Sequence, residues 1–144
     1  MEVTSSQERA ALLIVDHDPD IRDALTDLLT HYGYDVTCAA TAKEALREFS
    51  VSTFHAVILD LGLPDLHGLV VLQQLVTDRP TVPVIVLTAG SDEAQKIETL
   101  KLGAYSFLTK PYNKEPLQSV LIKALGRPPS SRLGSLSISL SATN

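Results

Sequence analysis

Residues 12–25, LLIVDHDPDIRDAL, join an apolar run to a cluster of acids and then to a helical pattern. The run LLIV is short, uncharged and rich in branched side chains, which is typical of a strand covered on both faces. Asp18-Pro19 marks a helix start, since Asp caps free amides and Pro is favoured at the first helical position. Apolar residues then recur at helical spacing from Ile21 to Leu29. The stretch predicts a strand that leads through an acidic turn into a helix.

The same strand–helix unit recurs four more times along the chain. Strands are expected at 11–15, 34–38, 56–60, 83–88 and 105–109. Helices are expected from Pro19 to Gly33, from Thr41 through the capping box TAKE, over 68–76, from Ser91 to near Gly103, and after Asn113 to Gly126. This alternation predicts an α/β fold, with a parallel sheet and helices on both faces. Functional side chains in such folds lie at the carboxyl ends of the strands.

The composition indicates one soluble domain of ordinary globular type. The chain has 144 residues, of which 44% are hydrophobic and 20% charged, enough to bury a core. A formal net charge of -5 without a basic run argues against a nucleic-acid-binding surface. Cys38 is the only cysteine, so no disulfide forms within the chain, as is usual in a reducing cytosol. The start lacks a signal-peptide pattern, and no stretch reaches the roughly 20 apolar residues of a membrane span. We therefore expect a cytoplasmic protein.

Charged and hydroxyl side chains lie where four of the predicted strands end. They are Asp16, His17, Asp18, Asp60, Thr88 and Lys110. Two carboxylates about 4 Å apart repel by roughly 4 kcal/mol at an effective dielectric of about 20, and a divalent cation relieves that repulsion. Mg²⁺ prefers oxygen ligands, and a carboxylate can act as a nucleophile towards phosphorus. The combination predicts phosphoryl transfer, with the ammonium and the hydroxyl holding the phosphoryl oxygens.

Residues 10 to about 126 resemble the receiver domains of two-component response regulators. The resemblance rests on four stretches, LLIVDHDPDIR, VILDLGLPDLHGL, PVIVLTAG and GAYSFLTKP. It implies a flavodoxin-like (βα)5 fold with the strands in the order 2-1-3-4-5. It leaves residues 1–9 as an N-terminal extension and 127–144 as a Ser/Pro-rich tail or the start of a linker. Within that tail, the alternating Leu136, Ile138 and Leu140 are compatible with an added edge strand.

The resemblance also implies a role for each matching residue. Asp60 matches the phosphoacceptor aspartate of the family, and Lys110 matches the lysine that precedes a proline beside it. Thr88 matches the switch hydroxyl. Phe107 matches the switch aromatic residue.

The implied metal site departs from the family pattern at one position. Asp16 matches the first acid of the metal-binding pair, with Asp60 and the backbone carbonyl of Gly62 as further ligands. The second acid of the pair is replaced by His17. Imidazole is a poor ligand for Mg²⁺, so we expect an affinity lower by about one to three kcal/mol, with Mn²⁺ as a substitute. His17 or Asp18 is a further candidate ligand, although Asp18 also fits as an N-cap.

The remaining histidines and the cysteine fit structural roles. His31, His55 and His67 show no ligand spacing and are expected at the surface, with His67 at a helix entry. Cys38 is expected to be a small buried residue.

The favoured function is a phosphorylatable switch and not an enzyme. A histidine kinase or phosphotransfer protein would donate a phosphoryl group to Asp60 with Mg²⁺ present, and self-phosphorylation and autodephosphorylation would be the only catalytic activities. Thr88 and Phe107 would then shift and reshape the surface of the fourth helix, fifth strand and fifth helix. That surface would control a downstream protein or an output domain outside this chain, and it is also the expected homodimer face.

Two other functions stay open at the level of sequence. The loss of a metal-binding acid at His17 is compatible with a receiver-like interaction module that takes no phosphoryl group. The motif DHD after a strand also resembles the opening of haloacid-dehalogenase-like phosphotransferases. Those proteins usually carry Thr or Val two residues beyond the second Asp, where this chain has Asp20, and the chain has no room for their cap domain.

Overall fold

The structure of the protein, a computed structural model, describes residues 9–89, 93–110 and 114–126. Within these ranges five strands alternate with five helices. The strands are β1 (Ala11–Val15), β2 (Asp35–Ala39), β3 (Ala56–Leu59), β4 (Val84–Thr88) and β5 (Ser106–Thr109). The helices are α2 (Pro19–His31), α3 (Ala42–Val51), α4 (Gly68–Asp78), α5 (Glu93–Lys101) and α6 (Lys114–Leu125).

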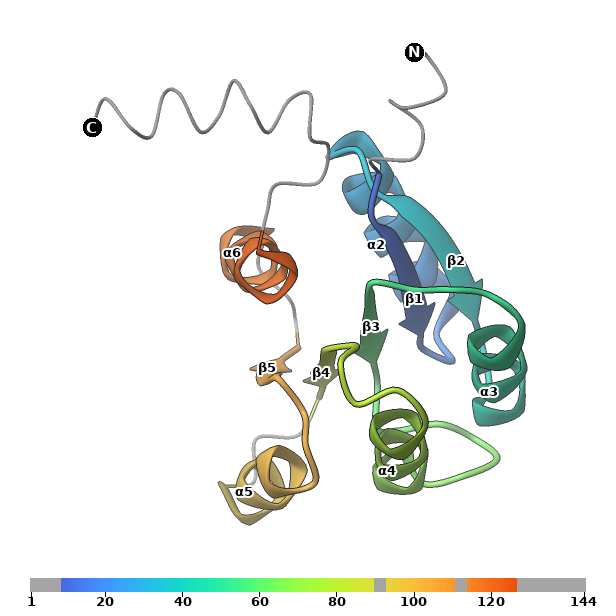
Figure 1. The fold of residues 1–144 in the computed structure, drawn as a ribbon, viewed down its shortest axis with the longest axis vertical. Coiled ribbons are helices and arrows are strands. Elements are labelled where there is room, and N and C mark those ends of the chain that lie inside the picture. The colour runs from blue at the N-terminus through green and yellow to red at the C-terminus, as the bar shows by residue number, and fades with distance from the viewer. Residues whose placement is uncertain (1–8, 90–92, 111–113, 127–144) are drawn as a thin grey trace.

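The strands form one parallel sheet in the order β2-β1-β3-β4-β5 (Figure 1), which confirms the predicted fold class and strand order. Val15, the last residue of β1, pairs with Ala39 on β2 and with Leu59 on β3. The backbone N–H of Asp60 continues this register by donating to the Val15 carbonyl at 2.8 Å. The chain segments that follow β1 and β3 therefore begin side by side.

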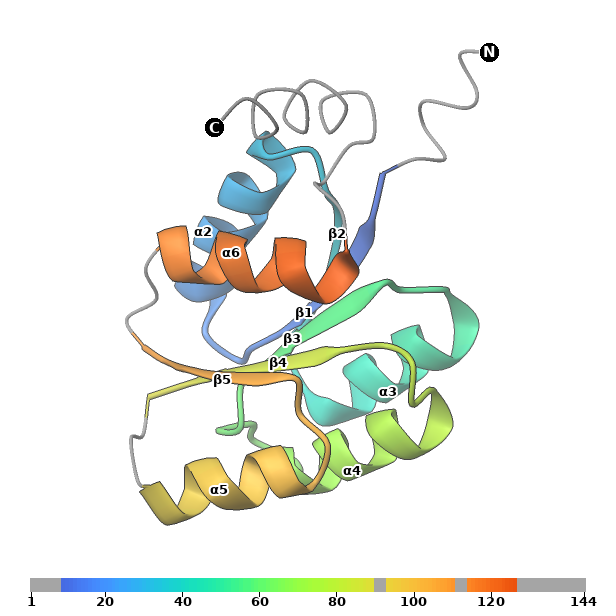
Figure 2. The ribbon, with the colours of Figure 1, turned by 60° about the vertical axis from the view of Figure 1, so that its left-hand side comes forward.

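The helices cover both faces of the sheet (Figure 2), with α2 and α6 on one face and α3, α4 and α5 on the other. Successive side chains of a strand point to opposite faces, so the sheet supplies two cores. The core on the α3 and α4 side includes Leu13, Phe49, Val57, Leu72 and Val86. The core on the α2 and α6 side includes Leu12, Leu25, Ile58, Ile85 and Leu121. Burial on both faces is the reason that β1, β3 and β4 are almost continuously apolar.

The ends of α2 follow the start and stop signals in the sequence. Asp18 is the N-cap, and its side chain accepts a hydrogen bond from the Asp20 N–H at 2.9 Å, while Pro19 is the first helical residue. Gly33, just beyond the helix, has a φ of 100°, in the left-handed region that residues with a Cβ rarely adopt. The predicted boundaries of this helix are thus confirmed.

The capping box at the start of α3 forms with one difference. The Thr41 hydroxyl accepts the Glu44 N–H at 3.1 Å, as expected for the N-cap. The Glu44 carboxylate accepts from the Ala40 N–H at 2.7 Å, one residue before the N-cap. The helix begins where the motif predicts, although its acidic side chain reaches one residue further back.

Cys38 is exposed, so the expectation that it would be buried is wrong. The residue lies on β2, which is an edge strand of the sheet. Its Sγ atom lies 3.1 Å from the hydroxyl of Thr26 on α2. The edge position thus overrides the general tendency of cysteine to be buried.

Three sequence expectations fall outside the described residues. They are the part of the N-terminal extension before Arg9, the helix start at Ser91, and the tail 127–144 with its possible strand at Leu136, Ile138 and Leu140. Among the described residues, no helix is both long enough and apolar enough to span a membrane.

Candidate functional site

Two buried carboxylates meet at the carboxyl ends of β1 and β3. Asp16 follows β1 and Asp60 follows β3, and the two residues are 3% and 4% exposed. The Asp16 N–H donates to the Ala39 carbonyl at 3.1 Å, and the bond from Asp60 to Val15 holds the second backbone. A buried charge is costly unless it is paired or hydrogen-bonded. A cation at this edge of the sheet would therefore stabilise the two carboxylates.

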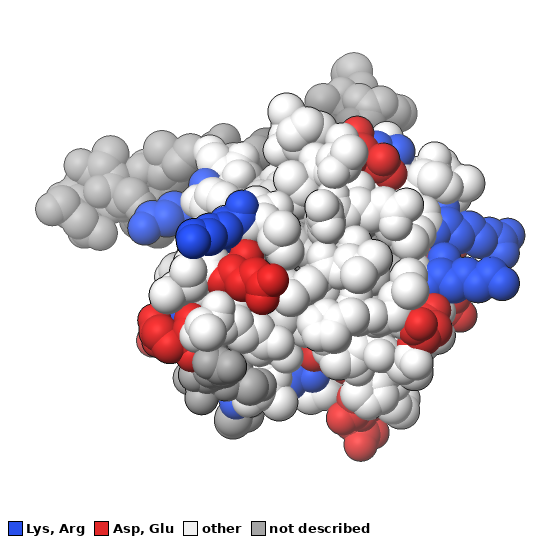
Figure 3. Space-filling view, turned by 90° about the horizontal axis from the view of Figure 1, so that it is seen from below, with Lys and Arg blue, Asp and Glu red and all other residues white. Residues whose placement is uncertain are grey.

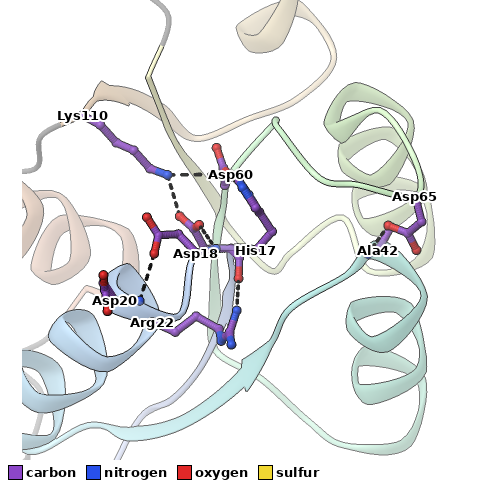
Figure 4. A network of polar contacts seen from close by, with 9 residues as sticks. His17, Asp18, Asp20, Arg22, Ala42, Asp60, Asp65 and Lys110 are labelled. Carbon is purple, nitrogen blue, oxygen red and sulfur yellow. Dashed lines mark hydrogen bonds and ion pairs between the residues drawn. The ribbon is translucent and has the colours of Figure 1, made fainter.

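Lys110 supplies a cation from the end of β5 (Figure 4). Its Nζ atom lies 2.7 Å from Asp16 Oδ2 and 3.5 Å from Asp60 Oδ2. Its backbone N–H donates to the Thr88 carbonyl at 2.8 Å, which anchors the residue to the end of β4. The Lys110 side chain is only 16% exposed, so the ammonium points into the site and not into bulk solvent.

His17 faces Asp60 from the turn after β1. Its Nδ1 atom lies 3.6 Å from Asp60 Oδ2, and its side chain is 56% exposed. One candidate ligand atom from each of Asp16, His17 and Asp60 lies within 4.8 Å of the others, which is close enough for a shared metal ion. Asp18 is outside this group. Its backbone N–H donates to Asp16 Oδ1 at 2.9 Å, and its own carboxylate caps α2.

The chemistry of these donors fits a hard divalent cation in part. Asp16 and Asp60 offer carboxylate oxygens, which Mg²⁺ prefers, and each oxygen has more than one lone pair. Gly62 lies beside them, because a Cβ atom at this residue would be 3.7 Å from Asp60 Oδ2. His17 offers a nitrogen, which suits Mn²⁺ or Zn²⁺ better than Mg²⁺. The two carboxylates can thus hold Mg²⁺, with one fewer oxygen ligand than three acids would give.

Thr88 and Phe107 share one face of the sheet. Thr88 is the last residue of β4 and is 7% exposed. Val86 pairs with Phe107 across β4 and β5, and Thr88 follows two residues later on the same face as Val86. Phe107 is half-buried and packs against the core that contains Val86. The hydroxyl and the aromatic ring therefore lie on the same side of neighbouring strands, two residues apart in register.

Two further residues stabilise this region through hydrogen bonds to backbone groups, and sequence patterns do not reveal them. Arg22 donates from Nη1 to the backbone carbonyl of Asp16 at 2.8 Å. Asp65, in the loop between β3 and α4, accepts the backbone N–H groups of Ala42 and Lys43 on α3 at 2.9 and 3.0 Å. The bonds from Ala42 and then Lys43 lower the pKa of the Asp65 carboxyl below its ordinary value. Arg22 and Asp65 stand within the quoted motifs, but their partners are backbone groups, which leave no signal in a sequence.

The other histidines serve the backbone or the surface, as expected. His31, His55 and His67 are exposed, and none belongs to the candidate metal group of the described residues. His55 Nδ1 accepts the Ala11 N–H at 2.9 Å, at the start of β1. His67 is the N-cap of α4 and accepts the Leu69 N–H at 3.1 Å, which confirms its predicted place at a helix entry.

Comparison with known proteins identifies the family of this chain. The family model described as the response regulator receiver domain matches residues 12–122. The transcriptional regulatory protein KdpE of Mycobacterium tuberculosis is 40% identical over 116 residues, which are 81% of this chain and 51% of that protein. The chain spans about half the length of KdpE and about a quarter of the length of the transcriptional regulatory protein ZraR of Escherichia coli.

Solved structures agree with the sequence relatives. The receiver domain protein (CheY-like) from Methanospirillum hungatei JF-1 gives a TM-score of 0.79 at 30% identity, over 82% of this chain and 94% of that one. The response regulator TrrA from Thermotoga maritima, solved in complex with Mg²⁺ and beryllofluoride, gives 0.75 at 29% identity, over 81% of this chain and 99% of that one. With its strand order, its acidic strand ends and the match over 12–122, the chain belongs to the response regulator receiver domain family.

Proposed function

We propose that Asp60 accepts a phosphoryl group and that this modification switches a surface of the domain. The observation that carries the proposal is the grouping of the buried Asp60 with Asp16 and with the ammonium of Lys110. A carboxylate in this setting can attack phosphorus, while the ammonium offsets the negative charge of the phosphoryl oxygens. Family membership favours this reading over the haloacid-dehalogenase-like alternative.

The proposed reaction is a transfer from a phosphohistidine of a histidine kinase or phosphotransfer protein. One Asp60 oxygen attacks the phosphorus, and the N–P bond to the donor histidine breaks as the new O–P bond forms. The donor imidazole takes up a proton, and Asp60 becomes an acyl phosphate. Asp16, Asp60 and the Gly62 carbonyl would hold Mg²⁺, which supplies positive charge to the phosphoryl oxygens when bound, with Mn²⁺ as a substitute. Lys110, whose Nζ atom lies 3.5 Å from Asp60 Oδ2, would supply a second positive charge.

The switch would run through Thr88 and Phe107. The phosphoryl oxygens would draw the Thr88 hydroxyl inward, and the Phe107 ring would turn into the space left behind. The placement of both side chains on one face supports this coupling. A change there shifts the population between two packings of the surface formed by α5, β5 and α6, which are the fourth helix, fifth strand and fifth helix of the sequence prediction.

The surface of α5, β5 and α6 is the proposed contact with partners. Among the described residues of this surface, the large exposed apolar side chains are Ile97, Leu100 and Tyr105. A downstream protein, an output domain of a longer regulator or a second copy of the chain would dock there, in the cytoplasm. KdpE, named a transcriptional regulatory protein, extends well beyond the matched region, which supports an output domain. Nucleic acid and membrane are not among the proposed partners of the receiver domain itself. Its only proposed catalysis is its own phosphorylation and dephosphorylation.

A phosphoryl-independent interaction module is the competing function. The observation that favours it is His17, which replaces an acid with an imidazole whose Nδ1 atom lies 3.6 Å from Asp60 Oδ2. Such a module would keep the receiver fold and its docking surface but would bind Mg²⁺ too weakly for transfer.

Stoichiometric phosphorylation of the full chain separates the two functions. Acetyl phosphate with Mg²⁺ should add the mass of one phosphoryl group as acetate leaves, and Asp60→Asn should abolish the gain. Asp27→Asn, at an exposed position on α2, is the matched control and should keep the gain. The absence of any mass gain with either Mg²⁺ or Mn²⁺ at saturation would favour the interaction module.

A further inference from the structure

The loop between β3 and α4 is firmly attached at its base. Leu61 is 5% exposed and packs into the core on the α3 and α4 side. The Gly68 N–H donates to the Leu61 carbonyl at 3.0 Å, which closes the loop. A Cβ atom at Gly68 would lie 2.3 Å from the Leu61 Cα, so the two backbones touch here and only glycine fits. The base is thus fixed, whereas residues 64–67 at the tip are exposed.

Asp65 attaches the exposed tip to a second element (Figure 4). Its two carboxylate oxygens accept the N–H groups of Ala42 and Lys43, at 2.9 and 3.0 Å, in the first turn of α3. The bonds lower the pKa of the Asp65 carboxyl, so the group is ionised at neutral pH. Charge-assisted bonds at the positive end of a helix are stronger than bonds between neutral groups.

The helix α3 already has a local cap without Asp65. Its N-cap is Thr41, whose hydroxyl accepts the Glu44 N–H at 3.1 Å. Asp65 takes the two remaining amides of the first turn from 23 and 22 positions further along the chain. Because both of its oxygens are bonded to a distant helix, Asp65 fixes the loop as well as the helix end.

We propose that Asp65 is a positioning residue for the site at Asp60, because it holds the loop tip against α3 and thereby keeps Gly62 beside the Asp60 carboxylate. This inference rests on the proposed function, in which the Gly62 carbonyl is a metal ligand. Gly62 lies between the fixed base at Leu61 and the tip at Asp65, and a Cβ atom on it would be 3.7 and 3.9 Å from the two Asp60 oxygens. Leu63 also packs against the core on the α3 and α4 side, so release of the tip would loosen the segment around Gly62 without detaching it, while Asp60 would keep its own bond to Val15.

Calorimetric titration of the full chain with MgCl₂ tests the inference. Asp65→Ala should raise the Mg²⁺ dissociation constant about tenfold, the lower end of the effect of groups that orient a metal ligand. Asp65→Asn keeps one oxygen that can accept an amide and should give a smaller rise. Thr41→Ala is the matched control, because it removes a bond from the same turn of α3 and leaves the loop attached. It should lower the melting temperature and leave the dissociation constant unchanged.

NMR relaxation of the backbone amides gives a second readout that does not depend on the metal. The order parameter of the Gly62 amide should fall in Asp65→Ala and stay unchanged in Thr41→Ala. Equal shifts of the Mg²⁺ dissociation constant in the two variants would overturn the inference, as would no shift in either variant or no Mg²⁺ binding by the wild-type chain. A wild-type chain that binds Mg²⁺ but gains no phosphoryl group from acetyl phosphate would instead overturn the proposed function.

Discussion

Replacement of His17 by aspartate should strengthen Mg²⁺ binding. His17 Nδ1 lies 3.6 Å from Asp60 Oδ2, so His17→Asp would place a third carboxylate beside the existing two. Unit charges about 4 Å apart interact by about 1 kcal/mol in water and by about 4 kcal/mol at an effective dielectric of about 20. The side chain at this position is 56% exposed, which keeps the gain below the upper value. We expect about 1 to 3 kcal/mol, equivalent to about a 5- to 150-fold lower dissociation constant.

Calorimetric titration with Mg²⁺ and with Mn²⁺ measures this gain. His17→Asn separates the added charge from the loss of the imidazole and should leave Mg²⁺ affinity near the wild-type value. Gln74→Glu, at an exposed position on α4, changes the net charge by the same amount away from the site and should have little effect. The preference for Mn²⁺ over Mg²⁺ should be weaker in His17→Asp, because a nitrogen ligand is replaced by oxygen.

In the absence of metal, His17→Asp should lower the stability of the fold. Lys110 is the ammonium that bridges Asp16 and Asp60, and a third carboxylate would leave negative charge in excess. The melting temperature of His17→Asp should therefore fall below that of the wild type in EDTA and recover when Mg²⁺ is added. An unchanged Mg²⁺ dissociation constant in His17→Asp would refute the electrostatic reasoning, and an equal gain in Gln74→Glu would assign the effect to net charge alone.

Asp18→Ala removes the N-cap of α2 and should lower the free energy of unfolding in urea by about 1 kcal/mol, with Mg²⁺ affinity unchanged. A large loss of Mg²⁺ affinity would instead identify Asp18 as a ligand. Gly68→Ala places a Cβ atom 2.3 Å from a backbone atom of the loop base and should destabilise the fold by about 1 to 3 kcal/mol. Gly62→Ala, whose Cβ would be 3.7 Å from an Asp60 oxygen, should change the unfolding free energy by less than about 0.5 kcal/mol. Equal melting temperatures of Gly68→Ala and Gly62→Ala would contradict the close contact at Gly68. The bonds to α3 hold the pKa of Asp65 below its ordinary value of 3.8, so its stabilising effect is complete above that unfolded-state value and is lost as pH falls through the lower folded-state pKa. Asp65→Asn should therefore lose less stability than the wild type on acidification below about pH 4. If the unfolding free energies of the two proteins, measured in urea, fell by the same amount on acidification, this reasoning would be contradicted.

The fold could be predicted from sequence because local and global signals agree. Short apolar runs alternate with helical patterns, and caps such as Thr41 and stops such as Gly33 mark the boundaries. Cys38 shows the limit of such reasoning. The predicted strand order already placed its strand at the sheet edge, but how far the neighbouring helix covers a side chain on an edge strand is a property of the assembled fold.

The residues grouped at the candidate site could be named from sequence because strand ends in a parallel sheet lie on one rim. Asp16, Asp60 and Lys110 each follow a strand, and the structure brings all three together. Arg22 and Asp65 could not be found in this way. Each contacts backbone groups, which every residue possesses, so only the three-dimensional path of the chain identifies their partners.

The surface formed by α3, α4 and α5 carries fewer charged side chains at its centre than the acidic rim, which is the group of Asp16 and Asp60 at the strand ends. Figure 3 shows a broad central area without charged side chains, with Lys, Arg, Asp and Glu arranged towards its margins. The helix α4 accounts for part of this, because Gly68 to Thr77 contains no charged residue and Val70 is 48% exposed.

The exposed thiol of Cys38 has an experimental use. The chain contains one cysteine and no tryptophan. A thiol-reactive fluorophore would therefore label a single position, and no tryptophan would contribute to the fluorescence. The neighbouring residue, Ala39, accepts the Asp16 N–H through its carbonyl at 3.1 Å. A dye on the Cys38 thiol would therefore lie one residue from a backbone group that is bonded to Asp16. A change in its emission on addition of Mg²⁺ would report metal binding in real time.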